Sequence, residues 1–395
     1  MKKKILFICF IDSIHSARWI NQLKSSDEFE IKIFPSRVTL DKHYDLNGYD
    51  IFVPFNLISQ IFKIINAHGL LKKIQRVIGF FINKYFKKYL DYNLRVVLES
   101  FKPDVVHTLE TQHAGYLFQR LRSKGFGISS IWWHSNWGSD IQLFSKIESH
   151  KLLIVDLLMG IDYYSCECNR DVLMASSLGF KGTALQVYPN TGGFQKDEIK
   201  LLRANSELTS KRKVILLKGY QGWAGRALIG IRALERCSEL LKDYTIKLYS
   251  VAPYSNDIEI SVALFTANTG VKMEILPNNL SHHEMLLLHS SARISIGLSV
   301  GDGISTSLLE AMAMGSFPIQ SNSSCCNEWF EHGISGYSVN AEDSESIEKF
   351  IRLALLNDEL VNSAAIINYE TIKNKADKDK LENVTLSNYR KILYN

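Results

Sequence analysis

The chain has no apolar run that approaches the length of a membrane-spanning helix, which needs about 18 or more consecutive apolar residues. Its opening residues, MKKKILFICFID, combine a basic start with a short apolar run. Asp12 ends that run, and no small-residue cleavage site follows it. We therefore expect a buried first strand here and a cytoplasmic protein.

Metal-binding patterns are also scarce. The six cysteines form no CxxC pair and no zinc-type spacing with histidines, so we expect reduced and mostly buried thiols. The DxD pattern from Asp377 to Asp379 lies in a lysine-rich stretch and favours a solvated helix surface. We expect no bound metal and no organic cofactor.

Excess charge of one sign is limited as well. The net charge is +5 over 395 residues, and no nucleic-acid-binding module accompanies the basic residues. The first predicted strand leads into IDSIHSAR, without the GxGxxG pattern of dinucleotide-binding folds. Both a nucleic-acid partner and a dinucleotide oxidoreductase are therefore disfavoured.

Short apolar runs recur along the chain with helix-length segments between them, as in KILFICF, PDVVHTLE, KVILLKG and ARISIGLSV. Continuous apolar strands separated by helices predict an α/β fold with parallel sheets covered on both faces. The chain length favours two domains. Two Rossmann-like domains facing a central cleft would bind a ligand at the carboxyl ends of their strands. The predicted segments are a first domain over 1–190, a linker over 191–212, a second domain over 213–375, and a C-terminal helix over 376–395 that can pack back on the first domain.

The stretch GDGISTSLLEAMAMG, residues 301–315, predicts a loop and a helix between two strands, with the helix ending at Gly315. Free backbone N–H groups at the helix start, residues 305–307, would bind phosphate oxygens with help from the helix dipole. Asp302 and Glu310 would then accept hydrogen bonds from hydroxyls at the two ends of a nucleotide sugar. The alternative is an ordinary capped helix after a glycine-rich turn.

Two cations and a histidine follow predicted strands. Lys218 ends the run KVILLK and Arg226 opens the next helix, where fixed positive charge would stabilise a departing diphosphate. The alternative is two surface cations on a polar loop. His134 follows the apolar run ISSIWW, so we expect it at the carboxyl edge of a sheet, where it would hydrogen-bond a sugar hydroxyl.

These motifs resemble a known family. Asp302, seven residues and Glu310 followed by AMAMG are similar to the EX7E signature of retaining GT-B-fold glycosyltransferases of family 4. The segments KPDVVHTLE, WWHSNWGSD, VYPNTGGF and NEWFEHGISGYSV resemble further parts of that family, so the likeness covers most of residues 100–355.

The resemblance implies that the first domain binds the acceptor and the second a nucleotide-diphosphate sugar. It implies that Asp302 contacts the donor sugar and Glu310 the nucleotide ribose. The catalytic residues predicted in this way are His134, Asp302, Lys218 and Arg226. The predicted donor-binding residues are Gly219, Gly303, Ser305, Thr306, Ser307, Leu309 and Glu310. Acceptor contacts are assigned to Ser13, His15 and Arg18.

The sequence departs from the family pattern in three places. Asp302 replaces the usual first Glu, Lys218 precedes Arg226 where the family has the reverse order, and IDSIHSARW replaces a glycine-rich loop. The family's mechanism implies retention without an enzyme nucleophile, the departing phosphate taking the acceptor's proton. A double displacement through Glu110 or Asp140 stays open.

We expect a metal-independent retaining hexosyltransferase that acts on a glycan or lipid-linked glycan acceptor in bacterial surface polysaccharide synthesis, such as lipopolysaccharide, O-antigen or capsule. Two alternatives remain. One is a sugar-nucleotide epimerase or hydrolase of the same fold, which would form product without an acceptor. The other is a non-catalytic scaffold that binds nucleotide sugars.

One basic and apolar segment, residues 63–95, contains eight Lys or Arg and a single acid, Asp91. On a helix from about residue 70, apolar and basic side chains fall on different faces. This pattern is typical of a helix on an anionic leaflet and predicts peripheral contact with the inner face of the cell membrane. The alternative is a domain helix with its apolar face packed and its basic residues in water.

Overall fold

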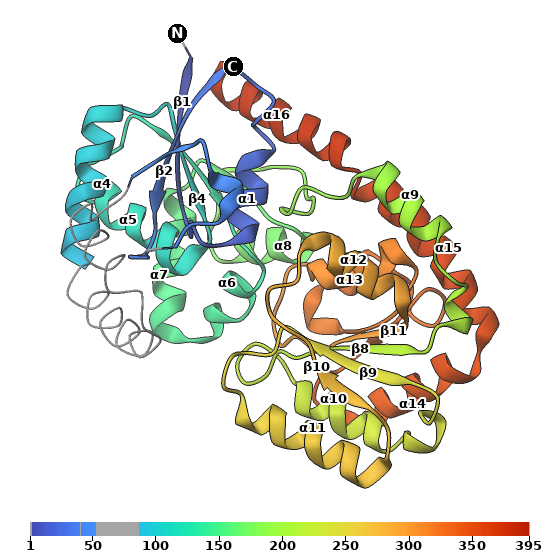
Figure 1. Ribbon diagram of the computed structural model, residues 1–395. Coiled ribbons are helices and arrows are strands. Elements are labelled where there is room, and N and C mark those ends of the chain that lie inside the picture. The colour runs from blue at the N-terminus through green and yellow to red at the C-terminus, as the bar shows by residue number, and fades with distance from the viewer. Residues whose placement is uncertain (1, 40, 53–86, 395) are drawn as a thin grey trace, which may run out of the picture. The chain divides into compact units, whose positions relative to one another are not determined.

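The computed structural model describes residues 2–39, 41–52 and 87–394 (Figure 1). The chain forms two compact units, Met1–Gly192 with Leu381–Asn395, and Gly193–Lys380. Most of the basic segment predicted to contact a membrane, residues 63–86, lies outside the described residues. Among the helices that are described, none is both long and apolar enough to cross a membrane.

The first unit is built on a seven-stranded parallel sheet in the order β3-β2-β1-β4-β5-β6-β7. Alternate residues of β1, an interior strand of this sheet, enter two different cores: Leu6 and Ile8 pack on one face, and Ile5 and Phe7 on the other. Both faces are therefore covered, as expected for continuous apolar strands. The strands are β1 Lys3–Cys9, β2 Phe29–Pro35, β3 Asp50–Ile51, β4 Val105–Leu109, β5 Ile131–Ser135, β6 Tyr163–Ser165 and β7 Thr183–Ala184.

The helices of this unit include the last one of the chain. Those among the described residues are α1 Ile14–Asn21, α4 Lys87–Phe101, α5 Tyr116–Arg122, α6 Ser139–Gln142, α7 Glu148–Gly160 and α8 Asn169–Ser177, with α16 Lys378–Tyr394 from Leu381 onward. In α16, the Tyr389 hydroxyl lies 2.6 Å from His107 Nδ1, and Thr385 Oγ1 donates to Gln22 Oε1 at 2.8 Å. The C-terminal helix is thus part of the first unit's core.

The second unit has a six-stranded parallel sheet in the order β10-β9-β8-β11-β12-β13. Its strands are β8 Val214–Lys218, β9 Thr245–Tyr249, β10 Met273–Ile275, β11 Ala292–Gly297, β12 Phe317–Ser321 and β13 Tyr337–Val339. Its helices are α9 Lys196–Ala204, α10 Ala227–Glu235, α11 Asn256–Thr269, α12 His282–Ser291, α13 Thr306–Met314, α14 Ser344–Leu356 and α15 Asp358–Lys375. The predicted α/β class with two parallel sheets is confirmed.

The segment predicted as a linker, residues 191–212, is more ordered than its composition suggests. From Gly193 onward it belongs to the second unit, and it carries α9, whose Ile199 is buried. Arg203 of α9 donates to the carbonyl oxygen of Ala365 at 3.0 Å, so α9 lies against α15 (Figure 1).

Candidate functional site

The start of α13 lies at a point of the second sheet where parallel α/β folds bind ligands. Strand β8 neighbours both β9 and β11, so the connections after β8 and β11 diverge to opposite faces of the sheet. Ligands of open α/β sheets bind beside the carboxyl ends of such a strand pair. Lys218 ends β8, and residues 298–305 lead from β11 into α13.

A cation and two hydroxyls meet at this helix start. Ser305 is the N-cap of α13, but its side chain makes no capping hydrogen bond. Its Oγ instead accepts from Lys218 Nζ at 3.1 Å and lies 2.8 Å from Ser307 Oγ. The positive end of the helix dipole and the ammonium group therefore act on the same small region, which favours an anion.

Lys218 is buried beside two uncharged groups. Only 8% of the residue is exposed, and its ammonium lies 4.2 Å from the centre of the Tyr220 ring. Both the Ser305 hydroxyl and this ring are uncharged, so neither neutralises the ammonium. A buried cation of this kind is stabilised further when an anion binds beside it.

Gly219 lets the chain turn closely after β8. A Cβ atom at this position would lie 2.4 Å from Val251 Cγ2 and 3.0 Å from the Tyr249 carbonyl oxygen. The Gly219 N–H donates to that same carbonyl at 2.7 Å. A side chain here would displace the backbone next to Lys218. Steric exclusion therefore explains why a glycine occupies this predicted donor-site position.

Arg226 has different surroundings from Lys218. Its guanidinium bonds to the Glu342 carboxylate and to the Gly222 and Gly225 carbonyl oxygens, the last at 3.0 Å. These contacts hold the loop between β8 and α10, whereas those of Lys218 reach the first turn of α13. The structure therefore does not bring the two predicted cations together in one contact, and a role of Arg226 on a leaving group stays a prediction.

The two predicted carboxylates differ in exposure. Asp302 is half-buried on the loop, three residues before Ser305. Glu310, on α13, is only 6% exposed. Its Oε1 lies 3.2 Å from His282 Nδ1 and its Oε2 lies 3.7 Å from His289 Nε2, both from α12. Sequence reasoning missed these two histidines, although their spacing of seven residues places them on one helix face.

Of the remaining residues predicted to contact the donor, two lie at the start of α13 and one lies in the apolar core. Gly303 is buried and Thr306 half-buried at the start of α13. Leu309 is 1% exposed and packs in an apolar cluster with Met312 and Ile304. The Leu309 side chain thus serves the core, and its backbone N–H already donates to the Ser305 carbonyl oxygen at 3.2 Å.

In the first unit, His134 lies between two buried hydroxyl groups. The ring is fully buried, with Nδ1 2.8 Å from Thr108 Oγ1 and Nε2 3.1 Å from Thr111 Oγ1. Burial lowers the pKa of His134 to about 3, so the ring is neutral at physiological pH. The imidazole thereby orders the turn after β4, and its predicted contact with a donor sugar stays a prediction.

We expect the burial of His134 to appear in the pH dependence of stability. The unfolded chain protonates this ring near pH 6.5, whereas the folded chain does so only near pH 3. The free energy of unfolding therefore falls as the pH falls below 6.5, by about 1.4 kcal/mol per pH unit. Between pH 7 and pH 5, the free energy of unfolding of His134→Gln should therefore fall by about 2 kcal/mol less than that of the wild type.

Urea unfolding followed by tryptophan fluorescence at the two pH values measures this difference. Replacement of the partly exposed His150 by Gln is the matched control in the same unit and should keep the wild-type pH dependence. Equal losses in the wild type and in His134→Gln would mean that the folded protein protonates His134 as readily as the unfolded chain does.

Two carboxylates accompany His134 at the carboxyl edge of the first sheet. Asp140 Oδ2 accepts from the backbone N–H groups of Thr111 and Trp137, each at 3.0 Å. Burial and the negative charge of Glu110 raise the pKa of Asp140 to about 7. Glu110 itself accepts from the backbone N–H of His113 at 2.9 Å and adopts a φ of 78°. Both carboxylates thus bind the turn at Thr111–Gly115, which gives them a structural task.

The predicted acceptor residues cluster around the start of α1. Ser13 is its N-cap and accepts from the His15 N–H at 3.2 Å. The His15 ring lies 5.5 Å from that of Trp137, between centroids, on the loop after β5. Arg18 lies one turn further along α1 and is half-buried. The first two residues therefore lie near the carboxyl edge of the sheet, and their contact with an acceptor stays a prediction.

The two acids of the DxD pattern lie at the start of α16. Asp377 Oδ1 accepts from the Lys380 N–H at 3.1 Å, so this carboxylate caps the start of α16. Asp379 is exposed in the first turn of the same helix. Metal independence itself stays a prediction.

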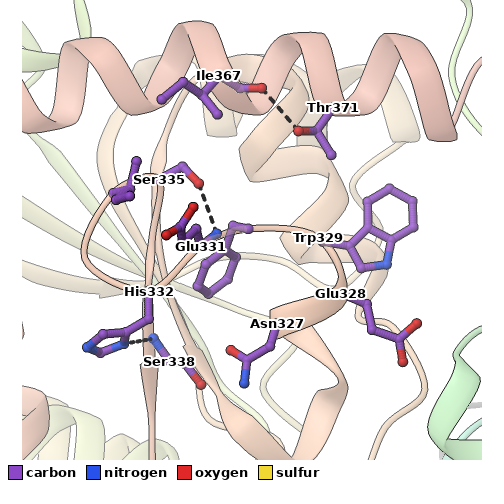
Figure 2. Close-up of a pocket in the computed structure, with 11 residues that line it drawn as sticks. Asn327, Glu328, Trp329, Glu331, His332, Ser335, Ser338, Ile367 and Thr371 are labelled. Carbon is purple, nitrogen blue, oxygen red and sulfur yellow. Dashed lines mark hydrogen bonds between the residues drawn. The ribbon is translucent and has the colours of Figure 1, made fainter.

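The segment NEWFEHGISGYSV forms one wall of a pocket of about 700 Å³ in the second unit (Figure 2). Its polar groups bond to one another: the Glu331 N–H donates to Ser335 Oγ at 3.2 Å, and the Ser338 N–H to His332 Nδ1 at 3.1 Å. These bonds stabilise the loop before β13. Residues that line the pocket are Asn327, Glu328, Trp329, Phe330, Glu331, His332, Ile334, Ser335, Ser338, Ile367 and Thr371.

Comparisons with known proteins agree with this architecture. Residues 267–372 match the family model described as "Glycosyl transferases group 1". This stretch contains α12, β11 and α13, and thus the Glu310 region. No curated protein matches the chain in sequence.

Three solved structures share the fold over the whole chain. Sucrose-phosphate synthase from Thermosynechococcus elongatus is 13% identical, with a TM-score of 0.70 and 100% of both chains covered. Anabaena HepE in complex with UDP-glucose is 13% identical, with a TM-score of 0.69, and 98% of this chain and 99% of that chain are covered. An α,α-trehalose 6-phosphate synthase from Burkholderia multivorans is 10% identical, with a TM-score of 0.71 and 99% of each chain covered. These likenesses confirm the predicted GT-B fold of two Rossmann-like domains.

Proposed function

We propose that this chain is a retaining glycosyltransferase of the EX7E type, which transfers a hexose from a nucleotide-diphosphate sugar to a hydroxyl of a glycan or lipid-linked glycan. The observation that carries the proposal is the contact of buried Lys218 with Ser305 at the start of α13, on the helix that also holds Glu310. The family match over 267–372 and the UDP-glucose bound to HepE support it.

The chemistry follows from where charge develops. As the bond between the sugar's anomeric carbon and the phosphate oxygen breaks, its electron pair leaves with the nucleotide diphosphate. The acceptor oxygen bonds to the anomeric carbon on the same face, and its proton passes to the departing phosphate. Lys218 and the α13 dipole stabilise the negative charge on that phosphate, which lowers the barrier without a metal.

The two acidic residues have separate tasks in this proposal. Asp302, on the loop, contacts the donor sugar, and Glu310 contacts the ribose. Asp302→Ala should therefore lower the transfer rate by about a hundredfold while the nucleotide affinity stays within about twofold. Glu310→Ala should weaken nucleotide binding by about tenfold, because hydrogen bonds to a charged group are lost.

Thermal shift with a panel of nucleotide sugars measures binding, and chromatography of a labelled acceptor measures transfer. Asp379→Ala, an exposed acid at the start of α16, is the control and should change neither quantity. Wild-type turnover in both site variants would refute the assignment. Product formed without any acceptor would point instead to an epimerase or hydrolase.

The proposal extends to bacterial surface polysaccharide synthesis at the cytoplasmic face of the membrane. The basic residues between 63 and 95 support this placement, because clustered Lys and Arg attract anionic lipids. Flotation with anionic vesicles at low salt tests this placement, and an unbound protein would exclude it.

A further inference from the structure

Two histidines of α12 face the buried carboxylate of Glu310. His282 Nδ1 lies 3.2 Å from Oε1, and His289 Nε2 lies 3.7 Å from Oε2. Within the part of the chain that the structure describes, neither nitrogen forms a hydrogen bond, so Glu310 is the polar group that each one faces. Each ring thus faces a different oxygen of the same carboxylate.

A buried carboxylate needs donors. Glu310 is 6% exposed, and a charge removed from water is strongly disfavoured unless hydrogen-bonded groups surround it. A neutral imidazole can donate one N–H without adding a charge of its own. Two imidazole N–H donors, one for each oxygen, would fix the rotation of the carboxylate.

The surroundings of His289 determine which nitrogen carries the proton. A carboxylate only accepts, so Nε2 must be the N–H nitrogen that faces Glu310, which leaves Nδ1 as the acceptor of a neutral ring. Nδ1 lies 3.0 Å from Ser295 Oγ, and that hydroxyl lies 2.7 Å from Ser316 Oγ. The Ser316 hydroxyl can therefore donate to Ser295 Oγ, and the Ser295 hydroxyl can donate to Nδ1. These two bonds would stabilise this tautomer.

Burial keeps His289 neutral. It lowers the pKa of the ring to about 4, and the positive charge of Lys218 acts in the same direction, while Glu310 opposes it. Tyr249 of β9 also packs edge-on against the His289 ring, 5.8 Å between centroids. The His282 ring stacks on that of Phe194, with 6.0 Å between centroids and 22° between the ring planes.

We propose that His282 and His289 are positioning residues that hold the Glu310 carboxylate toward the ribose hydroxyls of a nucleoside diphosphate. This inference rests on the proposed function, which gives Glu310 its ribose contact. It also gives α12 a role in the site. This helix holds the Glu310 carboxylate, which accepts hydrogen bonds from the ribose, in one orientation while α13 and Lys218 bind the phosphates. The 3.7 Å separation at His289 is longer than a formed hydrogen bond, so we expect it to shorten when ribose hydroxyls bind Glu310.

The test compares a nucleoside diphosphate with its dideoxy form. Calorimetry gives the dissociation constants of UDP, GDP and ADP, and the tightest of these is then compared with its 2′,3′-dideoxy analogue. The wild type should prefer the ribose form by about tenfold. His289→Leu and His282→Leu should weaken binding of the ribose form by about tenfold and reduce the preference to about threefold or less.

Conservative variants separate positioning from folding. His289→Gln keeps a donor near the Nε2 position, and His282→Asn keeps one near Nδ1, so both should restore affinity and preference to within about threefold of the wild type. His283→Leu is the matched control, because this neighbour on α12 is exposed and pairs with Glu198 at 2.9 Å. It should leave the preference for ribose unchanged.

Two results would overturn the role of the histidines but leave the proposed function standing. One is unchanged affinity in both leucine variants. The other is weaker affinity with the full preference for ribose retained, because that pattern marks a structural effect. A wild type that binds none of the three diphosphates would overturn the proposed function, and the histidine assignment with it.

Discussion

Lys218→Met is expected to lower the transfer rate at saturating donor by about a thousandfold while the second unit stays folded. The ammonium lies 3.1 Å from Ser305 Oγ at the start of α13, where a departing phosphate would gain charge. Methionine fills similar space without the charge, so the loss should fall on the chemical step more than on substrate binding. Initial rates with saturating nucleotide sugar measure the effect.

A strand lysine outside the site provides the control. Lys247, on β9, pairs with Glu274 at 3.7 Å and is only partly exposed. Lys247→Met should retain the wild-type rate, because this charge lies on a different part of the sheet from the α13 start. If Lys218→Met kept its rate within about tenfold, the lysine would not be the group that stabilises the leaving phosphate.

The fold could be predicted because its strands are continuous apolar runs. In β1, Ile5 and Phe7 enter one core while Leu6 and Ile8 enter the other, so these four consecutive positions are all apolar. Helix α9 was missed for the opposite reason. Its buried face rests on Ile199, and the many charges around it are typical of a loop as well as of a surface helix.

The candidate site was predictable where one local segment defines it. Ser305, Ser307 and Glu310 belong to a single loop and helix, so their proximity follows from the chain itself. The contact of Glu310 with His282 and His289 depends on how α12 packs beside α13, and no local pattern specifies that packing.

The burial of His134 also depends on residues distant in sequence. A strand-end histidine can line a site or complete a core, and the outcome depends on its neighbours. Thr108 and Thr111 supply hydroxyls to both ring nitrogens, which makes full burial of the ring tolerable.

Arg293→Met should destabilise the second unit by about 3–5 kcal/mol, and so lower its melting temperature by roughly 10 °C. Arg293 is 2% exposed and donates to the carbonyl oxygens of Ala354 and Leu355, at 3.0 and 2.9 Å, in the last turn of α14. It also donates to the Ser210 carbonyl at 2.6 Å and pairs with Asp358 at 2.8 Å. Helix C-terminal carbonyls lack partners within the helix, and a cation there offsets the helix dipole.

Removal of this guanidinium would leave several buried carbonyl oxygens without donors, which is more costly than the loss of an exposed ion pair. Arg352, on α14, provides that comparison, since it pairs with Glu239 and Glu348 at the surface. Arg352→Met should cost about 1 kcal/mol or less. Thermal unfolding followed by circular dichroism measures both variants. Equal losses of stability in the two variants would contradict this argument, because the buried contacts of Arg293 would then stabilise the fold no more than the surface ion pairs of Arg352.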